Sequence, residues 1–165
     1  MDRSIKPLAK DTCDGPSLDF PTVTPRLNLP VLYPGQAQKE FFVNEALARL
    51  DAVTHPVVEG TAVAPPADPH AGQCWIVASG STGLFADRSH ALAFHDGVQW
   101  SFIAAVPGMT VFDRSSGTLR RFGDTWSTPA TIVPPAGGVT VDAEARHAIV
   151  ALLQALEGLS ILKHG

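Results

Sequence analysis

The sequence predicts an α+β fold that is mainly β: a small antiparallel meander or barrel-like domain with a short helix before it and a helix after it. Glycine and proline supply 14 residues each, which is above average usage and favours many turns and short strands. Short apolar runs bounded by glycine-rich turns fill the middle of the chain, and two segments of helical periodicity flank them.

A short repeat runs through the strand region. Residues 72–75, 97–100 and 123–126 are three copies of Gly-x-x-Trp, and they contain all 3 tryptophans of the chain. We interpret each copy as a tight turn that launches a strand whose first large residue is the tryptophan. A spacing of about 25 residues suits one hairpin unit of a small meander or barrel.

Five segments have the composition of strands. They are residues 74–78, 91–94, 100–103, 110–113 and 118–122. Asp96-Gly97 predicts a hairpin, because glycine accepts the positive φ that a two-residue turn needs. The Ser-Ser-Gly of residues 115–117 predicts a second hairpin.

A helix is expected from about residue 36 to residue 53. Val43, Leu47 and Leu50 fall at i, i+4 and i+7 and form one apolar stripe, with Phe42 and Ala46 beside them. Pro56 ends the pattern. The simplest interpretation is that this stripe packs on the sheet of the same domain.

A second helix is expected after the Pro-Pro-Ala-Gly-Gly hinge of residues 134–138. Thr140 or Asp142 can cap it, and Gly158 is placed to end it. The apolar positions repeat at i, i+3, i+4 and i+7, at Ile149, Leu152, Leu153 and Leu156. Such a helix can fold back on its own domain or bundle with copies from neighbouring subunits, and the pattern leaves both open.

The chain divides into three expected parts. Residues 1–26 contain four prolines and no apolar periodicity, which predicts an extended N-terminal docking arm or a disordered tail. Residues 27–130 hold the first helix and the β domain. Residues 131–165 hold the hinge and the C-terminal helix.

Charge and apolar length exclude two classes of partner. The net charge is -4, from 12 Lys+Arg and 16 Asp+Glu, whereas a nucleic-acid binder normally carries a basic face. The longest apolar run, residues 148–153, is far too short for membrane insertion. No signal peptide is recognisable, so we expect synthesis in the cytosol, with Cys13 and Cys74 as reduced thiols.

Catalytic chemistry is not expected. No metal-binding motif or nucleophile motif is present in the sequence, so no catalytic residue, metal or cofactor is assigned. Four aspartates could in principle supply a glycosidase acid and base, but each falls at an expected turn, where aspartate commonly binds its own backbone. They are Asp87, Asp96, Asp113 and Asp124.

The tryptophans are the candidate ligand-binding residues. On an exposed sheet face, Trp75, Trp100 and Trp126 could stack on sugar rings of a glycan. Buried, they would form the core of a small β domain, and their regular spacing favours that alternative.

Several motifs resemble a known family. They are Leu29-Pro30, the Gly-Gln-Ala-Gln-Lys of residues 35–39 and the Asn-Glu-Ala-Leu-x-x-Leu-Asp of residues 44–51. These resemble the signature of the phage-associated domain of unknown function 2793, which occurs in prophages and gene transfer agents. The similarity continues through the first two Gly-x-x-Trp copies and a tail at residues 138–149.

The resemblance implies a virion structural protein assembled in the cytoplasm: a base or adaptor subunit of a head spike, or secondly of a tail fibre, that supports adsorption to the host. It implies capsid or tail proteins and a longer fibre or spike protein as partners, together with other copies of the chain in a trimer or pentamer. A module that binds cell-surface polysaccharide is the alternative. The resemblance carries no catalytic residue, and a capsule depolymerase is the least supported role.

Overall fold

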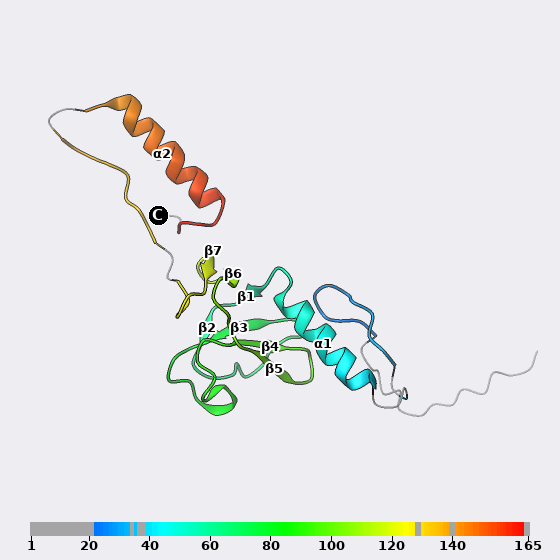
Figure 1. Ribbon diagram of the computed structural model, residues 1–165. Helices are drawn as coiled ribbons and strands as arrows, with labels where there is room; N and C mark the ends of the chain where they lie inside the picture. Colours follow the sequence, from blue (N-terminus) through cyan, green and yellow to red (C-terminus); the bar gives the residue numbers. More distant parts are fainter. Residues whose placement is uncertain (1–21, 34, 36–38, 128–129, 139–140, 164–165) are drawn as a thin grey trace, which may run out of the picture.

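The computed structural model describes residues 22–33, 35, 39–127, 130–138 and 141–163, and it shows an α+β fold that is mainly β (Figure 1). The elements in chain order are α1 (Lys39–Val53), β1 (Val57–Val58), β2 (Thr61–Ala62), β3 (Cys74–Val77), the 3-10 turn η1 (Gly83–Phe85), β4 (Leu92–His95), β5 (Trp100–Ile103), β6 (Thr110–Asp113), β7 (Thr118–Arg121) and α2 (Ala143–Gly158). The predicted fold class is confirmed.

The strands form two mixed sheets and no closed barrel across the described residues. One sheet has the order β2-β3-β4-β5 and the other has the order β1-β6-β7. Both predicted hairpins are present, since β4 pairs with β5 and β6 pairs with β7 in antiparallel register. The meander is interrupted because β1 and β2, of two residues each, pair in parallel with β6 and β3.

The main core lies between the two sheets. The four-stranded sheet contributes Cys74, Ile76, Leu92 and Phe94, and the other sheet contributes Val58 and Val111. Ala52, Phe122 and Trp126 close the same cluster. β4 is buried along its whole length, because a second, smaller cluster covers the opposite face of its sheet.

The loop of residues 22–33 lies against α1 and is part of the folded structure. The Thr24 amide donates to the Leu29 carbonyl at 2.9 Å, and the Val31 amide donates to the Thr22 carbonyl at 3.0 Å. Residues 22–26 of the expected docking arm are therefore ordered against the helix, whereas residues 1–21 lie outside the described residues. The docking role of the arm stays a prediction.

The apolar stripe of α1 does not pack on a sheet, so that expectation is wrong. Phe42 is 72% exposed, and Val43 and Leu50 are also exposed. The residues of α1 that are buried are Asp51 and Ala52. Polar side chains of the helix instead face the loop of residues 22–33, where Asn44 and Asp51 hydrogen-bond its backbone.

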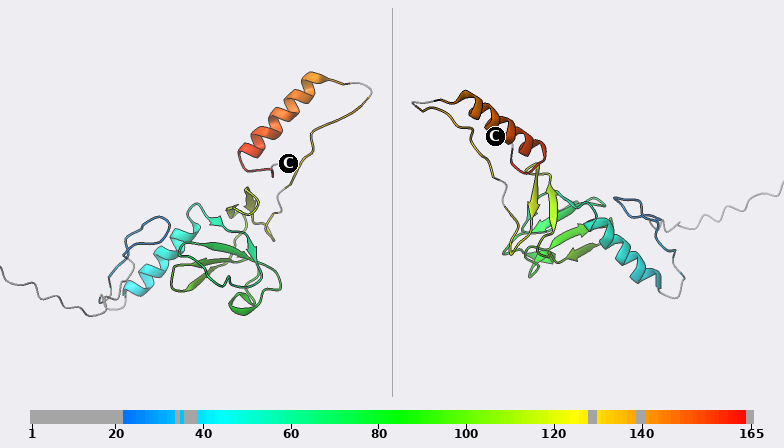
Figure 2. Two further views of the ribbon diagram at one scale, coloured as in Figure 1. Left: turned by 180° about the vertical axis from the view of Figure 1, so that it is seen from behind. Right: turned by 45° about the horizontal axis from the view of Figure 1, so that its top comes forward.

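α2 stands away from the two sheets, in all the views of Figures 1 and 2. Asp142 caps it by accepting the Ala145 amide at 2.9 Å, and the helix ends at Gly158 as predicted. None of its residues is buried. The alternative in which the helix folds back on its own domain is therefore not observed.

Candidate functional site

The candidate site is an aromatic face on the outer side of the four-stranded sheet. Trp75 lies on β3 and Trp100 on β5, and β4 runs between them. Ala93 of β4 is paired with Trp75 and lies on the same face of the sheet. Because alanine is small, the two indole rings meet across β4, with centroids 5.5 Å apart.

Two phenylalanines extend this face. Phe85, on η1, packs edge-on against Trp100 at 5.2 Å and against Phe102 at 5.8 Å. The Arg88 guanidinium lies over the Phe102 ring, 4.1 Å from its centroid, in cation–π geometry. We call Trp75, Phe85, Trp100 and Phe102 the aromatic face. Phe85 is buried, and the other three rings are half-buried.

A histidine fixes the turn at one end of the aromatic face. His95 pairs with Trp100 in the β4–β5 register, and their rings are 5.0 Å apart. Its Nδ1 accepts the Gly97 amide at 3.2 Å, which leaves Nε2 as the nitrogen that carries the proton in the neutral ring. Gly97 has a φ of +104°, and a Cβ there would stand 3.1 Å from the Cβ of Ala71. The turn therefore requires glycine on two counts.

Trp126 does not join the other two tryptophans. It follows β7 rather than starting a strand, and it forms an isolated bridge with Phe122 across a tight turn. Its ring is 6% exposed, and its Nε1 donates to the His90 carbonyl at 2.8 Å. The third Gly-x-x-Trp copy thus supplies a core residue, and stacking on a ligand is left to Trp75 and Trp100.

The thiol of Cys74 lies on the opposite, inner face of the sheet. Burial raises its pKa to about 12 from 9.0, because desolvation disfavours the thiolate. Cys74 is a free cysteine that packs in the main core, so it behaves as a small apolar side chain. Cys13 lies outside the described residues.

Two of the four aspartates act as turn residues, as expected. Asp96 accepts the Val98 and Gln99 amides, each at 2.8 Å. Asp113 accepts the Ser115 amide at 2.9 Å. Its other oxygen lies 3.3 Å from Arg120 in a largely buried ion pair. Both carboxylates are therefore engaged in holding hairpins.

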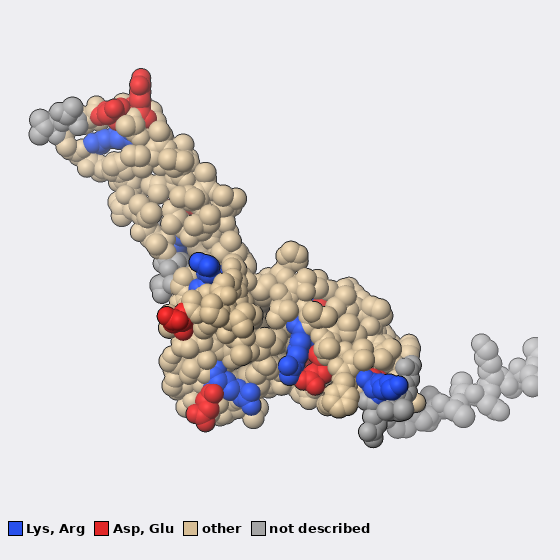
Figure 3. Space-filling model, in the orientation of Figure 1, with Lys and Arg blue, Asp and Glu red and all other residues tan. Residues whose placement is uncertain are grey.

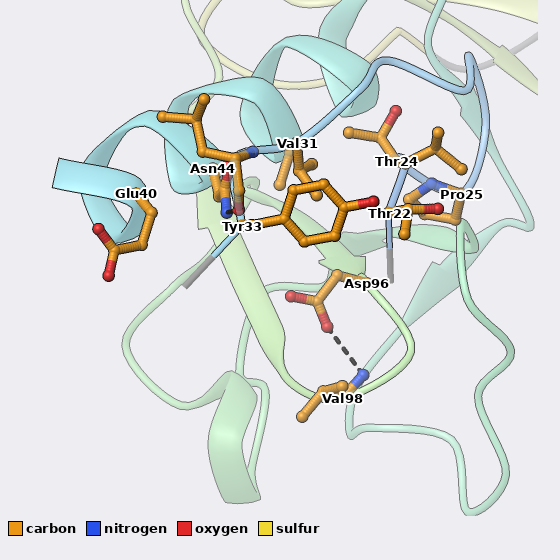
Figure 4. Close-up of a pocket in the computed structure, with 12 residues that line it drawn as sticks. Thr22, Thr24, Pro25, Val31, Tyr33, Glu40, Asn44, Asp96 and Val98 are labelled. Atoms are coloured by element: carbon orange, nitrogen blue, oxygen red, sulfur yellow. Dashed lines mark hydrogen bonds between the residues drawn. The ribbon is translucent and has the colours of Figure 1, made fainter. Parts of the chain in front are cut away.

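A second feature is a pocket between the loop of residues 22–33, α1 and the β4–β5 turn (Figure 4). Its volume is about 190 Å³. Tyr33 and Val98 border it from opposite sides, and Asn44 and Asp96 add polar groups. The pocket combines an apolar wall with a few hydrogen-bonding groups, which is the usual make-up of a small ligand or side-chain site.

Two residues that attach the loop of residues 22–33 to α1 were missed by the sequence analysis. Asn44 binds the backbone of Leu32 twice: its Oδ1 accepts the amide at 2.8 Å, and its Nδ2 donates to the carbonyl at 2.9 Å. Asp51 accepts the amides of Arg26 and Leu27, at 3.0 and 2.7 Å. Asn44 and Asp51 are seven residues apart and share one helix face, which is the signal that could have identified them.

Arg26 completes this attachment from the loop side. Its guanidinium donates to the carbonyls of Asp51, Thr54 and His55 at the carboxyl end of α1. A cation is favourable there, because the helix dipole is negative at that end. We call Arg26, Asn44 and Asp51 the loop clasp.

Neither a metal site nor a membrane-spanning helix is found in the part of the chain that the structure describes. No three His, Cys, Asp or Glu side chains in the described ranges group closely enough to hold a metal ion. Among the same residues, no helix has both the length and the apolar character needed to cross a bilayer.

Fold and site together define a small α+β module with two mixed sheets, an aromatic outer face and a loop clasped to its first helix. The chain belongs to the family described as "Protein of unknown function (DUF2793)", whose model matches residues 43–127. The match spans most of α1 and both sheets, and it excludes α2 and the loop of residues 22–33. A search of curated proteins returned no match.

Proposed function

We propose that this chain is a structural adaptor subunit of a phage-like particle, at the base of a head spike or, secondly, of a tail fibre, and that it supports adsorption to the host surface. Its role is binding and assembly rather than catalysis. The phage-like setting rests on the motif resemblance, and the role within the particle rests on the surface of the chain.

One observation carries the adaptor role: both helices present apolar side chains to solvent. Phe42 and Leu50 on α1 are exposed, and so are Ile149 and Leu152 on α2. Exposed apolar groups that gather along a helix mark an interaction surface. A subunit with an exposed apolar helix at each side of a small body has the construction of a connector between other proteins.

The sparse charge supports the same role. In Figure 3 the charged side chains are few and scattered, and uncharged surface dominates the visible face. Charged residues make up 17% of the chain, against roughly 25% in typical soluble domains. A low charge suits a surface that is covered by neighbours in an assembly.

Deletion of the arm tests the proposal. The deletion should remove residues 2–21 and keep Thr24 and Arg26, since both belong to the folded loop. We expect the shortened protein to fold with an unchanged near-ultraviolet spectrum and to be lost from purified particles. Retention of the shortened protein on particles at the full level would contradict an arm that docks.

Glycan binding is the second candidate, and the aromatic face favours it. Two half-buried indoles in contact on one sheet face suit the apolar side of a sugar ring, with weak affinity per site that several copies would raise. Trp75→Ala should then abolish binding on a glycan array. The matched control is Phe41→Ala, which removes an exposed ring of α1 that is not part of the aromatic face. Equal binding by the two variants would remove this candidate.

A further inference from the structure

The carboxyl end of α2 is attached to the body. The Leu119 amide donates to the Ser160 carbonyl at 2.6 Å, and the Lys163 amide donates to the Ala130 carbonyl at 2.9 Å. Leu162, just beyond the helix, is buried. The amino end of α2 points away from the sheets. There Arg146 donates to the Gly137 carbonyl of the hinge that precedes the helix. The attached end fixes a direction for the helix relative to the body.

Apolar residues along one side of α2 follow a heptad spacing. Successive steps of four, three and four residues join Ala145, Ile149, Leu152 and the half-buried Leu156, and a further step of three reaches Leu159, the first residue after the helix. Leu152 is 64% exposed, and Ile149 and Leu159 are also exposed. This spacing is the one with which identical helices interlock side by side. The apolar face of one α2 can therefore pack against the same face of α2 in another copy.

The apolar face is wider than a two-helix seam. Ala148, Leu153 and Ala155 flank the heptad positions on both sides. An apolar face restricted to the heptad positions can be buried by one neighbouring helix. A broader apolar face needs a neighbouring helix on each side to be buried. Such a stripe is buried when three or more helices surround one axis.

Charge does not oppose this packing. Between Arg146 and Glu157 no residue of α2 is an aspartate, glutamate, lysine or arginine. In the view of Figure 3, most of the charged side chains visible on α2 gather at its outer, amino end. Copies of α2 in register therefore bring no like charges together along the stripe.

We propose that α2 forms a parallel bundle with α2 of at least two further copies of this chain. Rotational symmetry about the bundle axis places every body at the same end, which matches the attachment of α2 at its carboxyl end. The proposal deepens the adaptor function and rests on it, since it names the contact that would make the adaptor a symmetric oligomer.

Cysteine cross-linking tests the direction and the register. In a full-length Cys13→Ser background, Ala145→Cys places a thiol on the stripe, and Ala143→Cys places one on the opposite side of the same turn. Cys74 can stay, because it is buried and its pKa is raised. Mild oxidation should give disulfide-linked dimers with Ala145→Cys and none with Ala143→Cys. An antiparallel pair would separate the two 145 positions, so absence of the Ala145→Cys dimer would overturn the proposal.

Solution mass provides the second readout. Light scattering over a dilution series should give at least three times the 17.4 kDa of one chain, and Leu152→Asp with Leu156→Asp should return the mass to one chain. Val106→Asp, at an exposed apolar position between β5 and β6, is the control and should leave the mass unchanged. A mass unaffected by the α2 changes would overturn the bundle. If the Leu152→Asp, Leu156→Asp variant were still found on particles, the adaptor function would stand without the bundle.

Discussion

Asp51 is the residue on which the attachment of the loop to α1 most depends. Its side chain is fully buried, and its two oxygens accept the amides of Arg26 and Leu27. Asp51→Ala should lower the free energy of unfolding by about 3 kcal/mol, because two partly buried donors lose their acceptor. Denaturant unfolding followed by tryptophan fluorescence measures the change.

The matched control is another carboxylate of α1. Glu45 forms an exposed i,i+4 ion pair with Arg49, and such pairs contribute about 0.5 kcal/mol or less. Glu45→Ala should therefore have little effect. Equal losses for the two variants would show that Asp51 is not a special acceptor.

Cys74 provides a residue-scale test of the core. Its pKa is raised from 9.0 to about 12 by burial, so the native state keeps a proton that the unfolded state releases above pH 9. The stability contributed by the neutral thiol is complete below pH 9, and it falls by about 1.4 kcal/mol per pH unit between pH 9 and pH 12.

In the Cys13→Ser background, iodoacetamide at pH 8 should leave the folded protein unmodified and should alkylate it fully in denaturant. Intact mass spectrometry distinguishes the two forms. Fast alkylation of the folded protein would show that the thiol reaches solvent.

At the scale of elements, Asn44 holds the loop of residues 22–33 near its end. Asn44→Ala removes both hydrogen bonds to Leu32, so exchange of the Leu32 amide should accelerate about tenfold. Hydrogen exchange followed by NMR measures this amide directly. Glu45→Ala, a truncation on the next residue, should leave its rate unchanged. An unchanged rate in Asn44→Ala would mean that the loop is held by other contacts.

The elements with strong local signals were predictable from the sequence. Asp96-Gly97 indicated a turn that Asp96 and Gly97 form together, and Gly158 marked the end of α2. β1 and β2 gave no signal, because two residues are too few to show a period. Their pairing with β6 and β3 is decided by partners far along the chain.

The site was predictable only in part, for a related reason. Periodicity located the apolar stripe of α1 but could not say which face of the helix is covered. Three similar Gly-x-x-Trp copies implied three similar tryptophans, yet Trp126 follows the last strand and has a core rather than a sheet face beside it. The loop clasp depends on backbone groups of residues 26, 27 and 32, which a sequence motif does not display.

At the scale of the whole molecule, two apolar helical faces are exposed on a body with few charges. The family match covers most of α1 and both sheets, and it does not extend to α2. An isolated monomer would keep both faces in water, at a cost of roughly 25 cal/mol for each Å² of apolar surface. Assembly into a particle would remove that cost.

The composition of purified particles tests this assembly role most directly. Quantitative mass spectrometry should be applied to gradient-purified phage-like particles from cells that express the chain. We predict that the chain co-purifies with the particles at a fixed stoichiometry that is a multiple of the oligomer number measured in solution. Its absence from the particles, with the full amount recovered as free protein, would contradict the adaptor function.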